Sequence, residues 1–251
     1  MNSTIQTQLS HRTIRAFTDE PVDESVISTL LDVARQTASS SFYQQFTLIR
    51  VKDASVREQI YQASGQPYVG GTQGELFIFV VDLSRTARIR AENGADMEPV
   101  GRATVFLQGV KDATLAAQNV AVAAESLGFG TCFLGSIGGD PALVIEALKL
   151  PKYTFPLVGL LVGHSNQQPA MKPRLPLVIT TAEDAYPDVE SAEYQEAWAE
   201  YDQVIQTYYD TREGGRPQAS FTNQLLNKVG GGKSEKVDVL QILHDQGLCT
   251  H

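Results

Sequence analysis

The sequence is poor in the residues that build disulfides and metal centres. Its 251 residues include two cysteines, one tryptophan and four histidines, and Cys132 and Cys249 lie far apart in the chain. There is no CxxC pair and no histidine at metal-ligand spacing, so neither a disulfide framework nor a metal site is indicated. The longest apolar run, 155–163, is far shorter than a membrane span, and the amino terminus lacks the apolar core of a secretion signal. We therefore expect a cytoplasmic protein that does not insert into a membrane.

Positive charge is also scarce. The chain has 20 lysines and arginines against 29 aspartates and glutamates, which gives a formal net charge of -9. A chain of this charge disfavours non-specific binding to nucleic acid or to an anionic membrane surface. Any anionic ligand must therefore be held by a local cluster of cations.

The hydrophobic periodicity predicts an α+β fold without regular βαβ repeats. Strands are expected at 46–51, 75–81, 131–135 and 155–163, and the continuous apolar run at 75–81 is typical of a central strand. Helices are expected at 23–36, with Asp23 as its cap, at 54–63, from 84, at about 100–127, from 141, with Asp140 as its cap, and around 190–210. A last helix is expected that Ser234 caps and Gly247 ends. The alanine-rich helix at 100–127 fits either a buried central helix or a helix that contacts a second subunit.

The first cation cluster lies in "SHRTIRAFTDEPV", residues 10–22. In an extended chain successive side chains alternate, so His11, Thr13 and Arg15 share one face while Arg12 and Ile14 share the other. Donors of this kind suit a phosphate, because arginine binds two oxygens at once. The alternative is a solvated basic patch that the following acidic residues offset.

Two further segments are candidate anion sites. The loop "TASSSFYQ" places Ser39, Ser40 and Ser41 just after a helix, where hydroxyl and main-chain N–H groups can surround an anion. A plain serine-rich loop is the alternative. In "MKPRLP", Lys172 and Arg174 share one face of an extended, proline-stiffened segment, which makes a second candidate phosphate clamp.

The glycine-rich stretch 128–139 is not a dinucleotide-binding motif. Phe133 stands where GxGxxG requires glycine, and the stretch leads into a strand instead of leaving one. Its glycines Gly135, Gly138 and Gly139 instead allow the main chain to approach a flat ligand. The sequence has no GxSxG or HExxH motif. Anion clamps without acid–base machinery fit an enzyme whose cofactor carries the chemistry.

Five stretches, in order and spacing, resemble the FMN-dependent nitroreductases: "SHRTIRAFTDEPV", "ASSSFYQ", "GQPYV", "AAESLGFGTCFLGSI" and "KPRLP". The NADPH-dependent, oxygen-insensitive nitroreductase and flavin reductase group is the most similar. The resemblance implies a nitroreductase-like fold, in which helices flank a central mixed, largely antiparallel sheet in an intertwined homodimer. It also implies an FMN-binding core at 1–164 and a C-terminal extension at 165–251, part of the same domain, whose arm and helices wrap the partner subunit.

The resemblance also implies the site residues. FMN would be bound by His11, Arg12, Thr13, Arg15, Ser39, Ser40, Ser41, Gln66, Leu134, Gly135, Ser136, Lys172 and Arg174, with the three serines reaching the FMN of the partner subunit. Substrate or NADPH would be bound by Phe42, Arg212, Arg216 and Lys236. No side chain is expected to be catalytic, because FMN carries the chemistry, and no metal is expected.

The chain departs from the family in two places. Gly135–Ser136 stands where the family usually has two glycines, and the usual C-terminal arginine cluster is represented by Arg212 and Arg216, with Lys236 further on. We expect these two arginines to bind the NADPH phosphate. The alternative is that they only face solvent on a flexible turn.

The activity implied is that of an NADPH-dependent FMN oxidoreductase that reduces nitroaromatics, quinones or free flavins by ping-pong hydride transfer. One alternative is a flavin reductase that supplies reduced FMN to another protein. Another is an FMN-binding storage or redox-sensing protein with little turnover.

Overall fold

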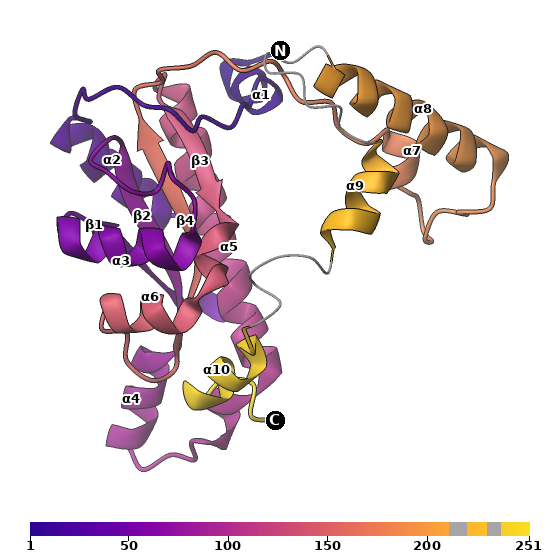
Figure 1. The fold of residues 1–251 in the computed structure, drawn as a ribbon. Coiled ribbons are helices and arrows are strands. Elements are labelled where there is room, and N and C mark those ends of the chain that lie inside the picture. The colour runs from indigo at the N-terminus through magenta and orange to yellow at the C-terminus, as the bar shows by residue number, and fades with distance from the viewer. Residues whose placement is uncertain (211–219, 230–236) are drawn as a thin grey trace. The chain divides into compact units, whose positions relative to one another are not determined.

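The computed structural model describes residues 1–210, 220–229 and 237–251, and it forms two compact units (Figure 1). The first unit comprises Met1–Pro169 and Lys236–His251, and the second comprises Ala170–Glu235. In the described ranges, no helix has both the length and the apolar character needed to cross a bilayer.

The first unit holds the sheet and most of the helices. Its strands are β1 (Phe46–Val51), β2 (Glu75–Asp82), β3 (Gly130–Leu134) and β4 (Thr154–Gly163). Its helices are α1 (Ser3–Leu9), α2 (Glu24–Arg35), α3 (Ala54–Ser64), α4 (Ser84–Glu92), α5 (Ala103–Ser126), α6 (Pro141–Ala147) and α10 (Val239–Asp245), with 3-10 turns η1 (Ser40–Phe42), η2 (Glu98–Gly101) and η3 (Gly135–Gly139). The four predicted strands are thus confirmed.

The sheet has the strand order β1-β2-β4-β3, and each neighbouring pair is antiparallel. A short parallel bridge joins Thr13 to Thr131 at the β3 edge, where the Ile14 N–H donates to the Thr131 carbonyl at 2.8 Å. The sheet is therefore largely antiparallel with a parallel contact, and the predicted α+β class is confirmed. This bridge also places the amino-terminal cation cluster beside β3.

Strand β2 is central, as its apolar run predicts, and it contributes to a core on each face of the sheet. Phe77 and Phe79 pack on one face with residues of α2 and α5, whereas Leu76 and Ile78 pack on the other with residues of α3 and α6. Side chains alternate along a strand, so a strand covered on both faces needs apolar residues at every position. The sheet is accordingly a middle layer between two layers of helices.

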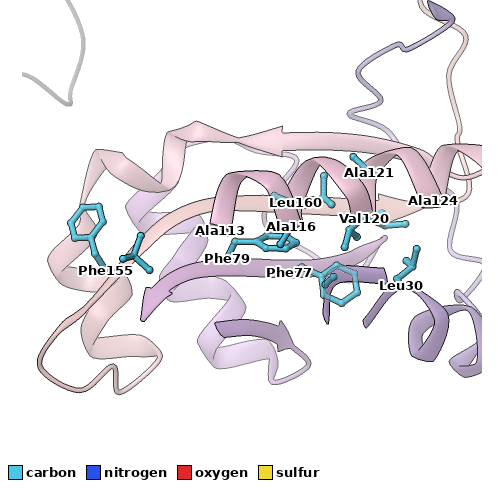
Figure 2. Packing of buried hydrophobic residues seen from close by; sticks show 14 of the residues in the cluster. Leu30, Phe77, Phe79, Ala113, Ala116, Val120, Ala121, Ala124, Phe155 and Leu160 are labelled. Carbon is cyan, nitrogen blue, oxygen red and sulfur yellow. The ribbon is translucent and has the colours of Figure 1, made fainter. Parts of the chain in front are cut away.

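Helix α5 is the central helix of the first core. Ala113, Ala116 and Ala124 are fully buried against the sheet, and Figure 2 shows Ala113 and Ala116 beside the ring of Phe79. Gly109 extends this close approach, because a Cβ atom there would lie 2.6 Å from Val81 Cγ1. The alanine-rich face is thus that of a buried central helix, and a contact of this helix with a second subunit stays a prediction.

Aspartates cap four of the described helices, α2, α3, α6 and α10, as expected for this residue at an N-cap. The Asp23 carboxylate accepts from Ser25 N, that of Asp53 from Ser55 N and Val56 N, and that of Asp140 from Leu143 N. The predicted caps at Asp23 and Asp140 are confirmed.

Two predicted helix starts are wrong. Helix α5 begins at Ala103 and not near residue 100, because Arg102 is extended after the separate 3-10 turn η2. Helix α10 begins at Val239, because the Asp238 carboxylate caps it by accepting from Gln241 N at 2.9 Å, so Ser234 is not its cap. Its predicted end is correct, since Gly247 follows the helix with a φ of +79°. Helices α1, α7 (Leu177–Thr180) and α9 (Phe221–Lys228) were not predicted.

The second unit contains α7 (Leu177–Thr180), α8 (Ala192–Asp210) and α9. Aromatic residues join its two longer helices: the Tyr201 and Phe221 rings meet edge to face at 5.3 Å, and Trp198 Nε1 donates to Thr222 Oγ1 at 2.8 Å. The predicted acidic helix around 190–210 is therefore confirmed as α8. That the extension wraps a partner subunit stays a prediction.

Candidate functional site

The amino-terminal cluster is anchored to the core through His11. Its Nδ1 atom lies 2.7 Å from Glu125 Oε1, and Thr131 Oγ1 donates to the same carboxylate oxygen at 2.5 Å. Glu125 stands near the end of α5, and its side chain is 13% exposed. A shielded carboxylate therefore ties the cluster to both α5 and β3.

A cavity of about 550 Å³ opens beside this anchor. Its lining is mostly polar and consists of Thr7, Ser10, His11, Arg12, Ile14, Glu125, Gly128, Phe129, Gly130, Ser165, Gln167, Gln168 and Pro169. His11 thus lines the cavity together with Arg12 and Ile14. The contact with Glu125 fixes the direction of the imidazole.

Arg12 and Arg15 are exposed and have no carboxylate partner among the residues that the structure describes. Arg12 donates only to the Ser10 carbonyl, at 3.3 Å, and the Arg15 guanidinium lies 5.8 Å from the centroid of the Tyr68 ring. Burial raises the pKa of the Cys132 thiol in β3, and the positive charge of Arg15 opposes that rise. The positive charge of Arg15 therefore acts on β3.

The serine loop does enclose an anion, but the anion is a side chain of the same protein. Ser39 Oγ donates to Asp112 Oδ2 at 2.7 Å, and Ser40 N donates to Asp112 Oδ1 at 2.9 Å. These two donors are therefore occupied within the chain. Ser41 is exposed, and the side chain of Phe42 is also exposed, at 80%.

The turn η3 follows β3 and presents its main chain to open space. A Cβ atom added at Gly135 or Gly138 would meet nothing within 4 Å. Leu134 is 1% exposed and packs in the core, so the open surface of this turn begins after it. At Gly135 and Gly138 this open turn satisfies the geometric requirement for close approach to a flat ligand. The prediction is wrong for Gly139, which packs against α3, because a Cβ atom there would lie 2.7 Å from the Ala63 carbonyl oxygen.

The departure at Ser136 has a structural explanation. The Ser136 and Ser64 hydroxyls lie 2.6 Å apart, so this side chain is held by the carboxyl end of α3. Gln66, two residues after Ser64, begins a turn in which Val69 N donates to the Gln66 carbonyl at 3.0 Å. The structure thus places Gln66 just beyond the segment that contacts η3.

The second unit contains the other predicted clamp. Lys172 and Arg174 are both exposed, and the Lys172 ammonium lies 5.8 Å from the centroid of the Tyr209 ring. The predicted NADPH-binding residues Arg212, Arg216 and Lys236 lie outside the described residues.

Sequence reasoning missed the two carboxylates that organise this region, although a signal for both exists. Asp112 lies three residues after Gly109 and four before Ala116, and Glu125 lies four after Ala121, which places both near the buried stripe of α5. An acidic residue on an alanine-rich, buried stripe requires hydrogen-bond donors, since burial of an unpaired charge is costly. Ser64 and Tyr68 carry no comparable signal.

Comparisons with known proteins match the whole length of the chain. Residues 9–164 match the nitroreductase family, and residues 172–251 match the C-terminal domain of that family. The FMN reductase (NADPH) of Bacillus subtilis is 36% identical over 229 residues, which cover 90% of this chain and 91% of the relative.

Solved structures agree with the sequence relatives. The NfrA1 nitroreductase of B. subtilis superimposes with a TM-score of 0.92 at 32% identity, covering 99% of this chain and 100% of that one. The NADPH:FMN oxidoreductase of Vibrio harveyi, solved in complex with NAD+, gives a TM-score of 0.86 at 31% identity, with both chains fully covered. On this fold, this site and these similarities, the chain belongs to the nitroreductase family.

Proposed function

We propose that this protein is an NADPH-dependent FMN oxidoreductase that reduces nitroaromatics, quinones or free flavins. The observation that carries the proposal is the pair of exposed arginines, Arg12 and Arg15, which have no carboxylate partner in the described part of a chain of net charge -9. Cations left unpaired in an acidic protein provide a local site for a phosphate.

The geometry of the β3 edge fits an elongated ligand with a phosphate at one end and a flat ring at the other. The bridge at Thr13 lies near the start of β3, and the open turn at Gly135 follows its end. Four residue steps separate the two ends of the strand, or about 13 Å. His11, Arg12, Thr13 and Arg15 would hold the phosphate and ribityl groups, and the main chain at 134–136 would support the ring.

FMN bound in this way supplies the hydride-transfer chemistry. The protein's own groups bind and orient it. Lys172 and Arg174 would place positive charge where reduction of the ring develops negative charge, and a preorganised charge of that kind favours the reduced state. Because the turn at Gly135 and Gly138 faces open space, a ring held there would leave room for the donor and the acceptor to bind in succession.

The names of the relatives support this proposal. The B. subtilis relative is an FMN reductase that uses NADPH, and the V. harveyi structure is that of an NADPH:FMN oxidoreductase. We further propose a homodimer in which Ser39, Ser40 and Ser41 line the FMN held mainly by the partner subunit. The extension 165–251 would wrap that partner, and the cytoplasm would be the protein's location.

The test is to purify the protein, identify its chromophore and measure turnover. We expect yellow protein that releases FMN and not FAD on denaturation, oxidises NADPH in the presence of quinone or nitroaromatic acceptors, and scatters light as a dimer. Protein that is colourless and cannot be reconstituted with FMN would overturn the proposal. Bound FMN without NADPH oxidation would instead indicate a storage or sensing protein.

A further inference from the structure

The loop between α2 and β1 has an unusual backbone. Ser41, Phe42 and Gln44 have φ angles of +51°, +60° and +52°, so three of the seven non-glycine residues with positive φ in the described ranges lie within four positions. Side chains with a Cβ atom disfavour this region, and bulky residues such as phenylalanine are rare there. Such conformations persist only where the surroundings enforce them, and they concentrate at functional sites.

The strained loop also carries two exposed aromatic side chains. Phe42 is 80% exposed and Tyr43 is 60% exposed, so the strained conformation does not bury either ring. Packing of these rings within the described chain therefore does not explain the backbone. The loop conformation has to be imposed by contacts at its two ends.

Asp112 makes those contacts. Its carboxylate accepts from Ser39 Oγ and Ser40 N before the strained residues, and from Gln45 N after them at 2.9 Å. Ser39 Oγ in turn accepts from Gln44 N at 2.7 Å. One carboxylate thus joins the two ends of the loop and leaves residues 41–43 to project outward.

The burial of Asp112 makes this contact a specific one. Asp112 is 1% exposed, and no lysine, arginine or histidine of the described chain forms an ion pair with it. A buried carboxylate is tolerated only when hydrogen-bond donors surround it, and here all of the donors come from the loop. The carboxylate and the loop conformation therefore depend on each other.

We propose that Asp112 is a positioning residue that fixes the loop 39–45 in the strained conformation in which it presents Ser41 and Phe42 to the electron acceptor. This inference rests on the proposed function of the loop as a wall of the flavin site. Asp112 itself is 1% exposed, and its described hydrogen bonds all go to the loop. It acts by joining the two ends of the loop, so that the loop is already ordered before the acceptor binds.

The first experiment tests the loop directly and requires no activity. Asp112→Asn keeps the shape of the side chain but replaces one carboxylate oxygen by an NH2 group, which donates hydrogen bonds and cannot accept them. The loop donors Ser39 Oγ, Ser40 N and Gln45 N then share a single acceptor oxygen. Chymotrypsin cleaves after exposed aromatic residues, and cleavage after Phe42 or Tyr43 is followed by mass spectrometry. We expect roughly tenfold faster cleavage in the variant, the change produced by loss of one or two hydrogen bonds.

The matched control is Val120→Ala. Val120 is also fully buried on α5, but it packs in the core and makes no hydrogen bond to the loop. This control lowers the melting temperature without removing a loop contact. Faster cleavage at Phe42 and Tyr43 in Asp112→Asn, but not in Val120→Ala, distinguishes positioning of the loop from general destabilisation.

The second experiment measures the KM for the electron acceptor. In protein saturated with added FMN, we expect Asp112→Asn to raise the KM for a quinone or nitroaromatic acceptor roughly tenfold, because the ordering of the loop then has to accompany binding. Ser39→Ala, a milder change, should shift the KM in the same direction. If the two residues act through one contact, the double variant will show less than the sum of the two effects.

The outcomes separate this inference from the proposed function. If the parent protein binds no FMN and oxidises no NADPH, the proposed function fails, and the cleavage comparison still decides whether Asp112 orders the loop. If the parent protein is active but Asp112→Asn resembles Val120→Ala in cleavage and in acceptor KM, Asp112 is only a structural residue and the inference is wrong. Fully additive effects of Asp112→Asn and Ser39→Ala would also overturn it.

Discussion

Two groups of arginines in the first unit differ in what surrounds them. Arg50 and Arg57 lie on β1 and α3, and their guanidinium groups are engaged: Arg50 donates to Glu75 at 2.7 Å and to Glu24 at 2.6 Å, while Arg57 donates to three backbone carbonyls of the loop 69–74. Arg12 and Arg15, on the amino-terminal segment, are exposed and have no carboxylate partner in the described ranges.

The difference separates charges that build the fold from charges that are available to a ligand. Hydrogen bonds to Glu75 and Glu24 raise the pKa of Arg50, whereas burial lowers the pKa of Arg57. Both are therefore strongly coupled to their surroundings. An arginine that makes three hydrogen bonds within its own chain, as Arg50 and Arg57 do, holds that chain together, and an arginine with free donors can hold a phosphate.

The largest expected effect is on stability, from Arg57→Ala. The guanidinium of this residue, which is 7% exposed, bonds to Val69, Gln73 and Gly74 carbonyls at 2.7 to 2.9 Å. Its removal should lower the free energy of unfolding by on the order of 3 kcal/mol, measured by urea titration. Arg88→Ala is the control, because Arg88 is exposed and its pair with Glu92 is long at 3.7 Å, so stability should hardly change. Equal effects would contradict the distinction.

Arg15→Ala should give the opposite result. Loss of one charge-assisted contact to a phosphate, on the order of 1.5 to 3 kcal/mol, should weaken FMN binding roughly tenfold or more. The unfolding midpoint of the FMN-free protein should stay close to that of the parent, because Arg15 has only the Tyr68 ring as a described contact. Fluorescence titration with FMN measures the affinity. A loss of stability without a loss of affinity would place Arg15 among the structural arginines.

The Arg212→Ala, Arg216→Ala double variant extends the comparison to the electron donor. If these residues bind the 2′-phosphate of NADPH, the change should raise the KM for NADPH by about five- to 150-fold, equivalent to roughly 1 to 3 kcal/mol. The KM for NADH and the bound FMN should be nearly unaffected, since neither involves that phosphate. Steady-state kinetics with both donors provide the test. Unchanged discrimination would direct attention to Lys236.

The smallest effect concerns an acidic residue that belongs to the fold. Hydrogen bonds from the Ser55 hydroxyl and from the Val56 and Ser55 backbone lower the pKa of Asp53, the cap of α3. The ionised cap thus stabilises the protein at pH values above the usual aspartate pKa, near 3.9. This stabilisation is lost as the pH falls through the lowered pKa of Asp53 in the folded protein. Asp53→Ala should therefore lower the urea midpoint at neutral pH and lose this difference in acid. A difference independent of pH would show that the charge of Asp53 does not contribute.

Local patterns predicted most of the first unit. The strands, the caps Asp23 and Asp140, and the α5 face follow from period, composition and cap chemistry, which act over a few residues. The start of α10 was missed because two polar residues, Ser234 and Asp238, compete as caps, and sequence alone does not rank them. Helix α1 was missed because none of its residues is buried and it has no apolar stripe.

For the site, the sequence by itself determined which residues are present and how they are spaced: a cation cluster at 11–15, a serine loop at 39–41 and a glycine turn after a strand. Only the tertiary structure decided which of them are free. It joined His11 to Glu125, 114 positions away, and Ser39 to Asp112, 73 positions away, and it left Arg12 and Arg15 without a carboxylate partner in the described ranges. Spacing along the chain determines only local geometry, whereas the partner of a buried carboxylate depends on which distant segments pack against it.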